Sequence, residues 1–390
     1  MLLRFPTELQ VFICERATRG TLVALLRTCS HLCLLIKPIL YRNVVLDDWR
    51  ARRVHGKGPN ILFTETSIYL FQITVLRTRS FCWEFITSLE IDEQEQIIGW
   101  HNLRLILPRL FNLLYLRINS LMWADDDQHG YFLLTYNITP RLREFSSATA
   151  VITVSFIDFL EEHPNLTVWR HGFSDSSPPT KLAAPSIPED ILSRFTQYEV
   201  MIDDPMRFTV NLRGMINLTH LSIRFYKTQK TATIQELAEA IDVCGRNITF
   251  FAFDGHIPSL WLQEQGQERS SSFKWVLVNF VARMPVLRHL QVKDWLEHPR
   301  LTSHITALIP ATLHTLRVRN SFNRQVALQH GSLERAFQAI NILYPFMPSM
   351  TTFIYHRHTL FRTDDRAWKL NTSAEDTWTP DWGLESSYFS

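Results

Sequence analysis

The chain has 390 residues, of which 46% are hydrophobic and 20% are charged, and this composition excludes a wholly disordered protein. Its length exceeds that of a usual single-core domain, so we expect several domains or one elongated repeat structure. The net charge of +2 provides no overall field that would recruit nucleic acid or an anionic membrane, and 12 glycines are few for a Rossmann-like fold.

The cysteines and the first residues predict an intracellular protein. The five cysteines are scattered and contain no Cys-x-x-Cys pair, which favours reduced thiols over disulfides or a structural zinc site. In the opening MLLRFPTELQ, Pro6, Glu8 and Gln10 interrupt the apolar residues before a signal-peptide core can form. The sequence contains no run of 18 apolar residues, so no membrane span is expected. We therefore predict a cytoplasmic or nuclear location and no membrane partner.

Residues 4–46 predict three short helices that follow no repeat spacing. Leu9, Phe12 and Ile13 share one helical face. A second, nearly continuous apolar face follows it, made by Leu22, Leu25, Leu26, Cys29, Leu32, Cys33 and Leu35. This is a large apolar surface for three short helices, so part of it should be covered by the next domain or by a partner.

The same segment resembles the F-box in its fungal form. It has an opening Phe5-Pro6-Thr7-Glu8, an Ile-containing first helix, a Leu/Cys-rich second helix, and a closing Pro-x-Leu-Tyr-Arg-x-Val at 38–44. It departs from the family pattern in its leading Phe and in lacking the frequent Trp after Cys-Arg. A plain helical cap on the following domain is the alternative interpretation.

The F-box resemblance implies a substrate receptor of a cullin-type ubiquitin ligase, whose helices pack on the Skp-family linker subunit. It assigns linker-subunit binding to Phe5, Pro6, Leu9, Ile13, Leu25, Leu26, Cys29, Leu32 and Leu35. Among these, we expect Leu25, Leu26 and Leu32 to be the central anchors, because a few residues usually dominate an interface.

From about residue 76 to 360, an apolar residue is followed by a second three positions later and a third two positions after that. The full copies are Ile86-Leu89-Ile91, Leu113-Leu116-Ile118, Phe195-Tyr198-Val200, Leu218-Leu221-Ile223, Ile248-Phe251-Phe253, Leu287-Leu290-Val292, Leu313-Leu316-Val318 and Met350-Phe353-Tyr355. Weaker copies occur at Leu142-Phe145 and Leu166-Trp169. Upstream of many copies the apolar period lengthens toward 3.6, so each unit predicts one helix and one strand. One such helix is predicted to begin with a capping box at Thr233 and to end at Gly245 as a left-handed cap.

These units must stack, because one helix and one strand cannot bury their own apolar faces. The pattern resembles the leucine-rich repeat family in an irregular, long-helix form. The predicted fold class is therefore α/β: an N-terminal three-helix F-box, then a solenoid with a curved parallel sheet and helices on its convex side. We predict domains at 1–48, 49–363 with a Pro/Ser-rich loop at 174–190, and 364–390 as an acidic, Trp-containing tail.

Four Asn-x-Thr triplets raise the alternative of N-linked glycosylation. They begin at Asn137, Asn165, Asn217 and Asn247, and three of them lead into repeat strands. Their middle residues occupy apolar positions of the repeat, which favours a structural role for the triplets.

The residues that alternate with the repeat positions should form an outward column on the other face of the sheet. We expect this column to turn from acidic to basic along the chain and to bind the target protein. Its candidate substrate-binding residues are Tyr115, Arg117, Arg224, His289, Lys293, Arg317, Arg319 and His356. Arginines there would suit an acidic or phosphorylated segment, but an ordinary solvated strand face is the favoured interpretation.

Signatures of catalysis are absent from the sequence: it has no Gly-x-Ser-x-Gly, no phosphate loop, no Gly-x-Gly-x-x-Gly and no His-Glu-x-x-His. His356 and His358 with Asp364 and Asp365 could hold a metal ion, but further ligands are missing. We expect no enzyme activity, no cofactor and no metal. The predicted function is that of a ubiquitin-ligase adaptor for an unknown protein substrate. The alternative is a leucine-rich-repeat scaffold with no ligase role, and a nucleic-acid partner is not expected.

Overall fold

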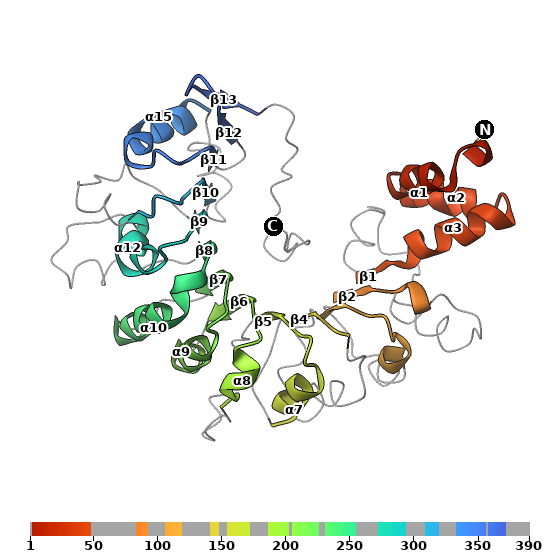
Figure 1. Cartoon of the computed structure of the whole chain (residues 1–390), viewed down its shortest axis with the longest axis horizontal. Helices are drawn as coiled ribbons and strands as arrows, with labels where there is room; N and C mark the ends of the chain where they lie inside the picture. Colours follow the sequence, from red (N-terminus) through yellow and green to blue (C-terminus); the bar gives the residue numbers. More distant parts are fainter. Residues whose placement is uncertain are drawn as a thin grey trace, which may run out of the picture. The chain divides into compact units, whose positions relative to one another are not determined.

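The structure is a computed structural model of the chain (Figure 1). It describes residues 2–47, 83–92, 106–118, 141–147, 154–171, 186–202, 205–225, 231–254, 272–293, 309–319, 333–355 and 358–371. The chain divides into two compact units, Met1–Ile187 and Pro188–Ser390, here called the first and the second unit. Each unit is considered by itself.

The first unit begins with three helices: α1 (Thr7–Glu15), α2 (Arg19–Leu26) and α3 (Ser30–Tyr41), preceded by the 3-10 turn η1 (Leu2–Arg4). The Thr18 hydroxyl accepts the Thr21 N–H at 3.2 Å and so caps α2. The helices have a small core of their own, made of Cys14, Leu22, Leu32 and Ile36. This segment is therefore a packed unit and not a single extended amphipathic helix.

A parallel sheet follows these helices in the first unit. Its strands pair in chain order: β1 (Asn43–Asp47), β2 (Ser88–Asp92), β3 (Tyr115–Ile118), β4 (Glu144–Ser147) and β5 (Val168–His171). The connecting segments include η2 (Trp83–Phe85), η3 (Leu107–Arg109) and α7 (Val154–Glu162). Register pairing aligns Leu89 with Leu116, then with Phe145 and Trp169. The same repeat position thus faces the core in successive strands.

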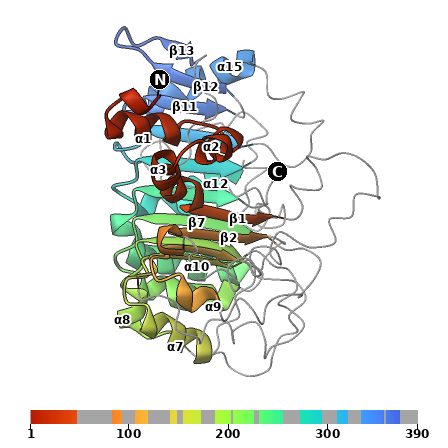
Figure 2. The ribbon, with the colours of Figure 1, turned by 90° about the vertical axis from the view of Figure 1, so that its right-hand side faces the viewer.

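The second unit repeats this construction. Its parallel strands are β6 (Gln197–Ile202), β7 (His220–Phe225), β8 (Phe250–Asp254), β9 (His289–Lys293), β10 (Thr315–Arg319) and β11 (Thr352–Tyr355), and Figure 2 shows parallel strands as stacked arrows. The helices are α8 (Glu189–Leu192), α9 (Pro205–Gly214), α10 (Thr231–Cys244), α12 (Ser272–Asn279) and α15 (Leu333–Leu343), with η6 (Gly245–Asn247), η7 (Val281–Arg283) and η8 (Tyr344–Phe346). Within this unit, α9, α10 and α12 lie on one side of the strands (Figure 1).

The core of both units is built from the predicted repeat positions. All of them are buried, and the most exposed, Tyr355, has only 7% of its surface accessible. Helix residues such as Leu212, Leu237 and Ile241 are also fully buried. Because each repeat covers the apolar face of the next repeat within its unit, stacking removes nearly all of this surface from water. The predicted α/β class, with parallel strands and helices, is confirmed.

Two details of α10 differ from the prediction. The helix begins at Thr231, so Thr233 lies inside it and cannot be its capping residue. Gly245 begins η6 instead of forming a left-handed cap. A Cβ at Gly245 would lie 2.7 Å from the carbonyl oxygen of Arg283, so close backbone approach is the reason for glycine here.

Asparagine and threonine side chains connect the turns that lead into neighbouring strands. The Asn217 amide donates to the Ser193 carbonyl oxygen at 2.8 Å, and the Thr219 hydroxyl donates to the Thr196 carbonyl oxygen at 2.9 Å. Asn247 and Thr249 bond in the same way to Ile216 and Thr219, at 3.1 and 3.2 Å. Two Asn-x-Thr triplets are thus part of a repeating hydrogen-bond ladder, which supports their structural interpretation.

An antiparallel hairpin follows β11. It consists of β12 (His358–Arg362) and β13 (Trp368–Leu370), and the ring of Trp368 lies 6.1 Å from that of Tyr344. The first residues of the predicted tail therefore belong to the sheet. Most of the predicted Pro/Ser-rich loop and residues 372–390 lie outside the described residues.

Candidate functional site

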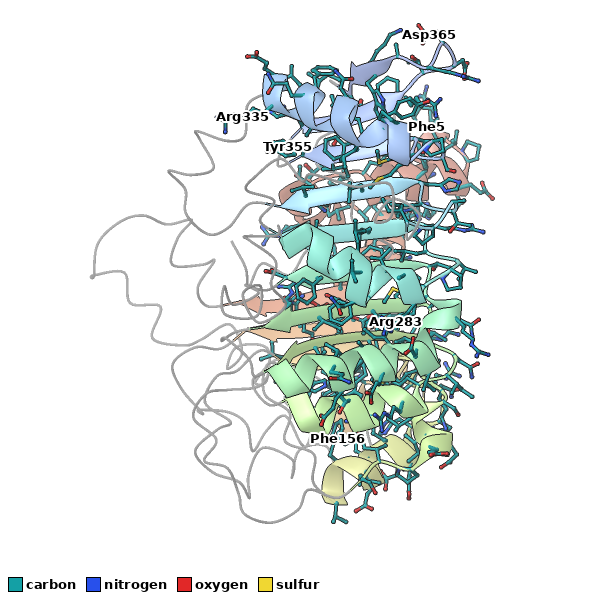
Figure 3. All side chains as sticks on the ribbon, turned by 90° about the vertical axis from the view of Figure 1, so that its left-hand side faces the viewer. Phe5, Phe156, Arg283, Arg335, Tyr355 and Asp365 are labelled. Atoms are coloured by element: carbon teal, nitrogen blue, oxygen red, sulfur yellow. The ribbon has the colours of Figure 1, made fainter. Side chains whose placement is uncertain are left out.

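Helix α1 presents an apolar stripe to solvent. Leu9, Phe12 and Ile13 stand at spacings of three and one, on one side of the helix, and are 48%, 49% and 41% exposed. Phe5, just before the helix and labelled in Figure 3, is 42% exposed. The α1 stripe is defined here as Phe5, Leu9, Phe12 and Ile13.

Exposed apolar residues are concentrated in the three-helix segment. Large hydrophobic side chains that are exposed in the described residues number 15, and seven of them lie between residues 3 and 34: Leu3, Phe5, Leu9, Phe12, Ile13, Val23 and Leu34. The other eight are distributed over residues 111–361. Single exposed apolar residues are ordinary, but a cluster on one short segment is typical of an interaction surface.

Polar contacts hold α1 in place. Gln10 is only 3% exposed, and its amide nitrogen donates to the Phe5 carbonyl oxygen at 2.7 Å. Its amide oxygen is 3.0 Å from Nε2 of His31 on α3, so this nitrogen carries the proton and donates. At the other end of α1, Glu15 lies 3.6 Å from Arg42. These contacts fix the helix and leave the α1 stripe exposed, although the Arg16 guanidinium lies over the Phe12 ring, 4.2 Å from its centre.

The nine predicted linker-binding residues fall into three groups. Exposed are Phe5, Pro6, Leu9 and Ile13, whereas Leu25, Leu26, Cys29 and Leu35 are partly buried. Leu32 is 4% exposed and belongs to the core of the three helices. It cannot serve as an anchor, as expected from the motif, without opening that core. The F-box resemblance did not include Phe12 among the linker-binding residues, although helical spacing placed Phe12 on the same apolar face as Leu9.

The expectation of a solvated outward column is wrong for several residues. Arg117 and Arg317 are 7% and 4% exposed. Other side chains on this face of the strands, here called the polar face, are also largely buried, as in Glu90, Glu144, Arg170 and Gln291. Neighbouring long side chains on closely spaced strands pack against one another, which the alternation rule by itself does not reveal.

Arginines of the polar face are paired with carboxylates on adjacent strands. In the first unit, Arg117 lies 3.6 Å from Glu90, and Arg170 lies 3.2 Å from Glu144. In the second unit, Arg224 lies 3.1 Å from Glu199. The predicted change from acidic to basic is therefore wrong for these strands, because charge alternates between neighbours. Arginines neutralised in this way are poor receptors for a further anion.

The remaining predicted substrate-binding residues are in different settings. Tyr115 is 40% exposed. His289 is partly buried, and its pKa is lowered by burial and by the nearby positive charges of His314 and Arg288. Lys293 and Arg319 occupy paired register positions at the ends of β9 and β10. His356 lies outside the described residues.

Metal-binding clusters and membrane-spanning helices are absent from the described residues. No three potential metal ligands come together in the described ranges. None of the helices seen in these ranges combines the length and apolar character required to cross a bilayer. His171 is buried against Trp169, with ring centroids 4.5 Å apart, and burial lowers its pKa to about 3. It is a neutral core residue.

Comparisons with known proteins assign no family. No protein-family model matches the chain, and no curated protein matches it. A crystal structure of a structural-genomics target from Bacteroides fragilis aligns with 11% sequence identity and a TM-score of 0.32. The alignment covers 66% of this chain and 66% of that protein.

Proposed function

We propose that the chain is a substrate-recognition adaptor of a cullin-type ubiquitin ligase. In this proposal, residues 4–46 are an F-box that docks on a Skp-family linker subunit, and the stacked units are leucine-rich repeats that bind a target protein. The exposed α1 stripe carries the proposal, since it lies on a three-helix segment that has a core of its own and whose sequence resembles the F-box. The parallel repeat strands supply a rigid domain for target binding.

The physical basis of docking is burial of the α1 stripe. Transfer of apolar surface from water contributes about 25 cal/mol per Å², from which association and ordering costs are subtracted. Phe12 and Leu9 are the proposed anchors because they lie near the middle of the stripe and are almost half exposed. Leu25 and Leu26 are partly buried against the helical core, so they are proposed to support the anchors.

Co-purification with a Skp-family linker subunit tests the proposal. The full chain should form a stable complex with the linker and, through it, with a cullin. A Leu9→Asp, Phe12→Asp double variant should bind at least about 30-fold more weakly, because loss of an interface hot spot costs about 2 kcal/mol or more. Ile216→Asp is the matched control, since Ile216 is an equally exposed apolar residue of the second unit, at 52%.

Unfolding measurements separate loss of binding from loss of folding. The Asp substitutions replace exposed side chains, so circular dichroism and denaturant midpoints should stay close to those of the unchanged chain. Absence of any complex between the unchanged chain and the linker would contradict the ligase role. A different protein captured through the same stripe would favour the scaffold alternative.

A further inference from the structure

The turns that lead into β9 and β10 carry a pair of basic residues. Arg288 immediately precedes β9 and His314 immediately precedes β10, and both side chains are exposed. His289 pairs with Thr315 in the register of the two strands, so Arg288 and His314 are neighbours in the same register. Figure 3 draws these strands with their arrowheads to the left, so the turns that lead into them lie to the right.

The fold does not require basic residues at these two positions. At the equivalent position, the strands β6, β7, β8 and β11 are preceded by threonines: Thr196, Thr219, Thr249 and Thr351. The hydroxyls of Thr219 and Thr249 donate to the carbonyl of the preceding unit. Among the described repeats of the second unit, only the two adjacent repeats of β9 and β10 have an arginine and a histidine in place of this threonine. Side chains that depart locally from a structural repeat are candidates for function.

A rigid frame holds the two residues. The Thr312 hydroxyl donates to the Leu287 carbonyl oxygen at 2.7 Å and so connects the turn before β10 to the turn before β9. The His314 backbone N–H donates to the Arg288 carbonyl oxygen at 2.8 Å. The ring nitrogen Nδ1 of His314 bonds to the Thr312 carbonyl oxygen. Because a carbonyl can only accept, Nδ1 carries the proton of this hydrogen bond, which holds the ring beside the turn.

The electrostatics of these turns favour an anion. No carboxylate pairs with Arg288 within the described ranges, in contrast to Arg117, Arg170 and Arg224 on the polar face. Arg288 and His314 both act on His289, whose pKa is lowered first by burial and then by their charges. Like charges on adjacent strands repel each other. An anion bound between the two side chains would be attracted to both and would offset this repulsion.

We propose that Arg288 and His314, with His289 beside them, form a binding site for one phosphoryl group. A guanidinium binds two oxygens of a phosphoryl group through parallel charge-assisted hydrogen bonds, and an imidazolium can bind a third. The two residues come from adjacent strands about 5 Å apart, a spacing that suits one tetrahedral anion. Nucleic-acid binding usually uses several phosphate contacts, and the chain has a net charge of only +2.

The source of the phosphoryl group follows from the proposed function. If the repeat units receive a target protein, this site would recognise a phosphorylated serine or threonine of that target. This assignment rests on the proposed function, whereas the oxyanion site itself rests on the contacts of Arg288 and His314.

The first experiment uses inorganic phosphate as the probe. Histidine-selective NMR and thermal unfolding of the full chain are followed as phosphate replaces chloride at constant ionic strength. Phosphate should shift the ring signal of His314 and raise the unfolding temperature. An Arg288→Gln, His314→Gln double variant should bind phosphate at least about tenfold more weakly, since two charge-assisted hydrogen bonds are lost. An equal rise in the unfolding temperature of the two proteins, or equal effects of phosphate and chloride on the unchanged chain, would overturn the site.

Arg143→Gln is the matched control for this experiment. Arg143 is also exposed and stands at the same repeat position, immediately before β4 in the first unit. The control should keep the phosphate response of the unchanged chain. A loss of the response in the control would show that general positive charge, and not the Arg288 and His314 pair, is responsible, and it would overturn the proposal.

The second experiment identifies the source of the phosphoryl group. The probes are a decapeptide with one phosphoserine among uncharged residues, the same peptide with serine, and a single-stranded RNA of 20 nucleotides. The phosphopeptide should bind at least about tenfold more tightly than its serine counterpart, and only when Arg288 and His314 are present. Tighter binding of RNA with a steep salt dependence would overturn the peptide assignment, as would equal binding of the two peptides.

Failure of this inference and failure of the proposed function give different results. The Arg288→Gln, His314→Gln variant should still co-purify with the linker subunit, because both residues belong to the second unit. If phosphate binds but the linker does not, the anion site stands and the ligase role fails. If the linker binds but phosphate does not, the reverse holds.

Discussion

Phe12 on α1 and Phe251 on β8 are residues of the same type in opposite environments. Phe12 is 49% exposed, whereas Phe251 is fully buried. Phe251 is covered because the next repeat places Leu290 beside it in register and Phe280 packs against its ring. Polar contacts of Gln10 and Glu15 hold α1, and the Arg16 guanidinium over the Phe12 ring leaves that ring half exposed. The difference teaches that repetition covers apolar surface within the chain, while a non-repeated segment can keep it for a partner.

Truncation of the two phenylalanines should give the largest contrast. Phe251→Ala should lower the free energy of unfolding by about 3–5 kcal/mol, because a buried ring leaves a cavity. Phe12→Ala should change it by less than about 0.5 kcal/mol, because its ring is already half in water. Chemical denaturation measures both. Equal destabilisation would mean that the α1 stripe is covered within the chain.

Breaking a largely buried ion pair should have a somewhat smaller effect. Glu199→Gln removes the carboxylate that lies 3.1 Å from the Arg224 guanidinium on the polar face, and loss of one partner of such a pair should cost at most about 3 kcal/mol. Glu239→Gln is the control in the same unit, since its pair with Arg213 is half exposed and contributes less than about 1 kcal/mol. Similar denaturant midpoints for the two variants would contradict the burial of the polar face.

The pH dependence of unfolding should reflect His171. Its folded-state pKa of about 3 lies below the ordinary value of 6.5, so the unfolded state takes up the proton first as pH falls. The stability gained from a neutral His171 is complete above pH 6.5 and decreases between 6.5 and 3. From pH 7 to 5 the loss should be about 2 kcal/mol. A His171→Gln variant lacks this titration, so parallel stability curves for the two proteins would refute the assignment.

The smallest loss of stability is expected when the hydrogen-bond ladder between the turns is broken. Asn217→Ala removes the hydrogen bond to the Ser193 carbonyl and should cost about 1 kcal/mol. Ile216→Ala, at the neighbouring exposed position, should cost less than about 0.5 kcal/mol. Thermal unfolding compares the two. A neutral Asn217→Ala would mean that the ladder does not contribute to stability.

The repeat strands were predictable because their signal is local and redundant. Positions such as Leu221, Leu290 and Leu316 recur at the same spacing, and the structure aligns them in one register. The start of α10 was mispredicted because a threonine and a glutamate at capping distance also occur inside a helix. Gly245 was assigned the wrong role because the approaching Arg283 carbonyl lies far away in the sequence.

The candidate sites were predictable only in part. Helical spacing alone placed Leu9, Phe12 and Ile13 on one face, but it could not tell whether that face is covered. Likewise, alternation placed Arg117 and Arg317 on the polar face but did not reveal their burial. The pairing of Arg170 with Glu144 joins different strands, so no local pattern contains it.

By itself, the sequence determined which residues are apolar at which period, and with that the alternation of helices and parallel strands. Periodicity depends only on residues that are close together along the chain, so it can be recognised from the sequence alone. Only the tertiary structure decided which apolar face stays exposed, which arginines are neutralised and that Arg288 stands beside His314. Exposure and charge pairing depend on distances between segments remote in sequence, and folding alone sets those distances.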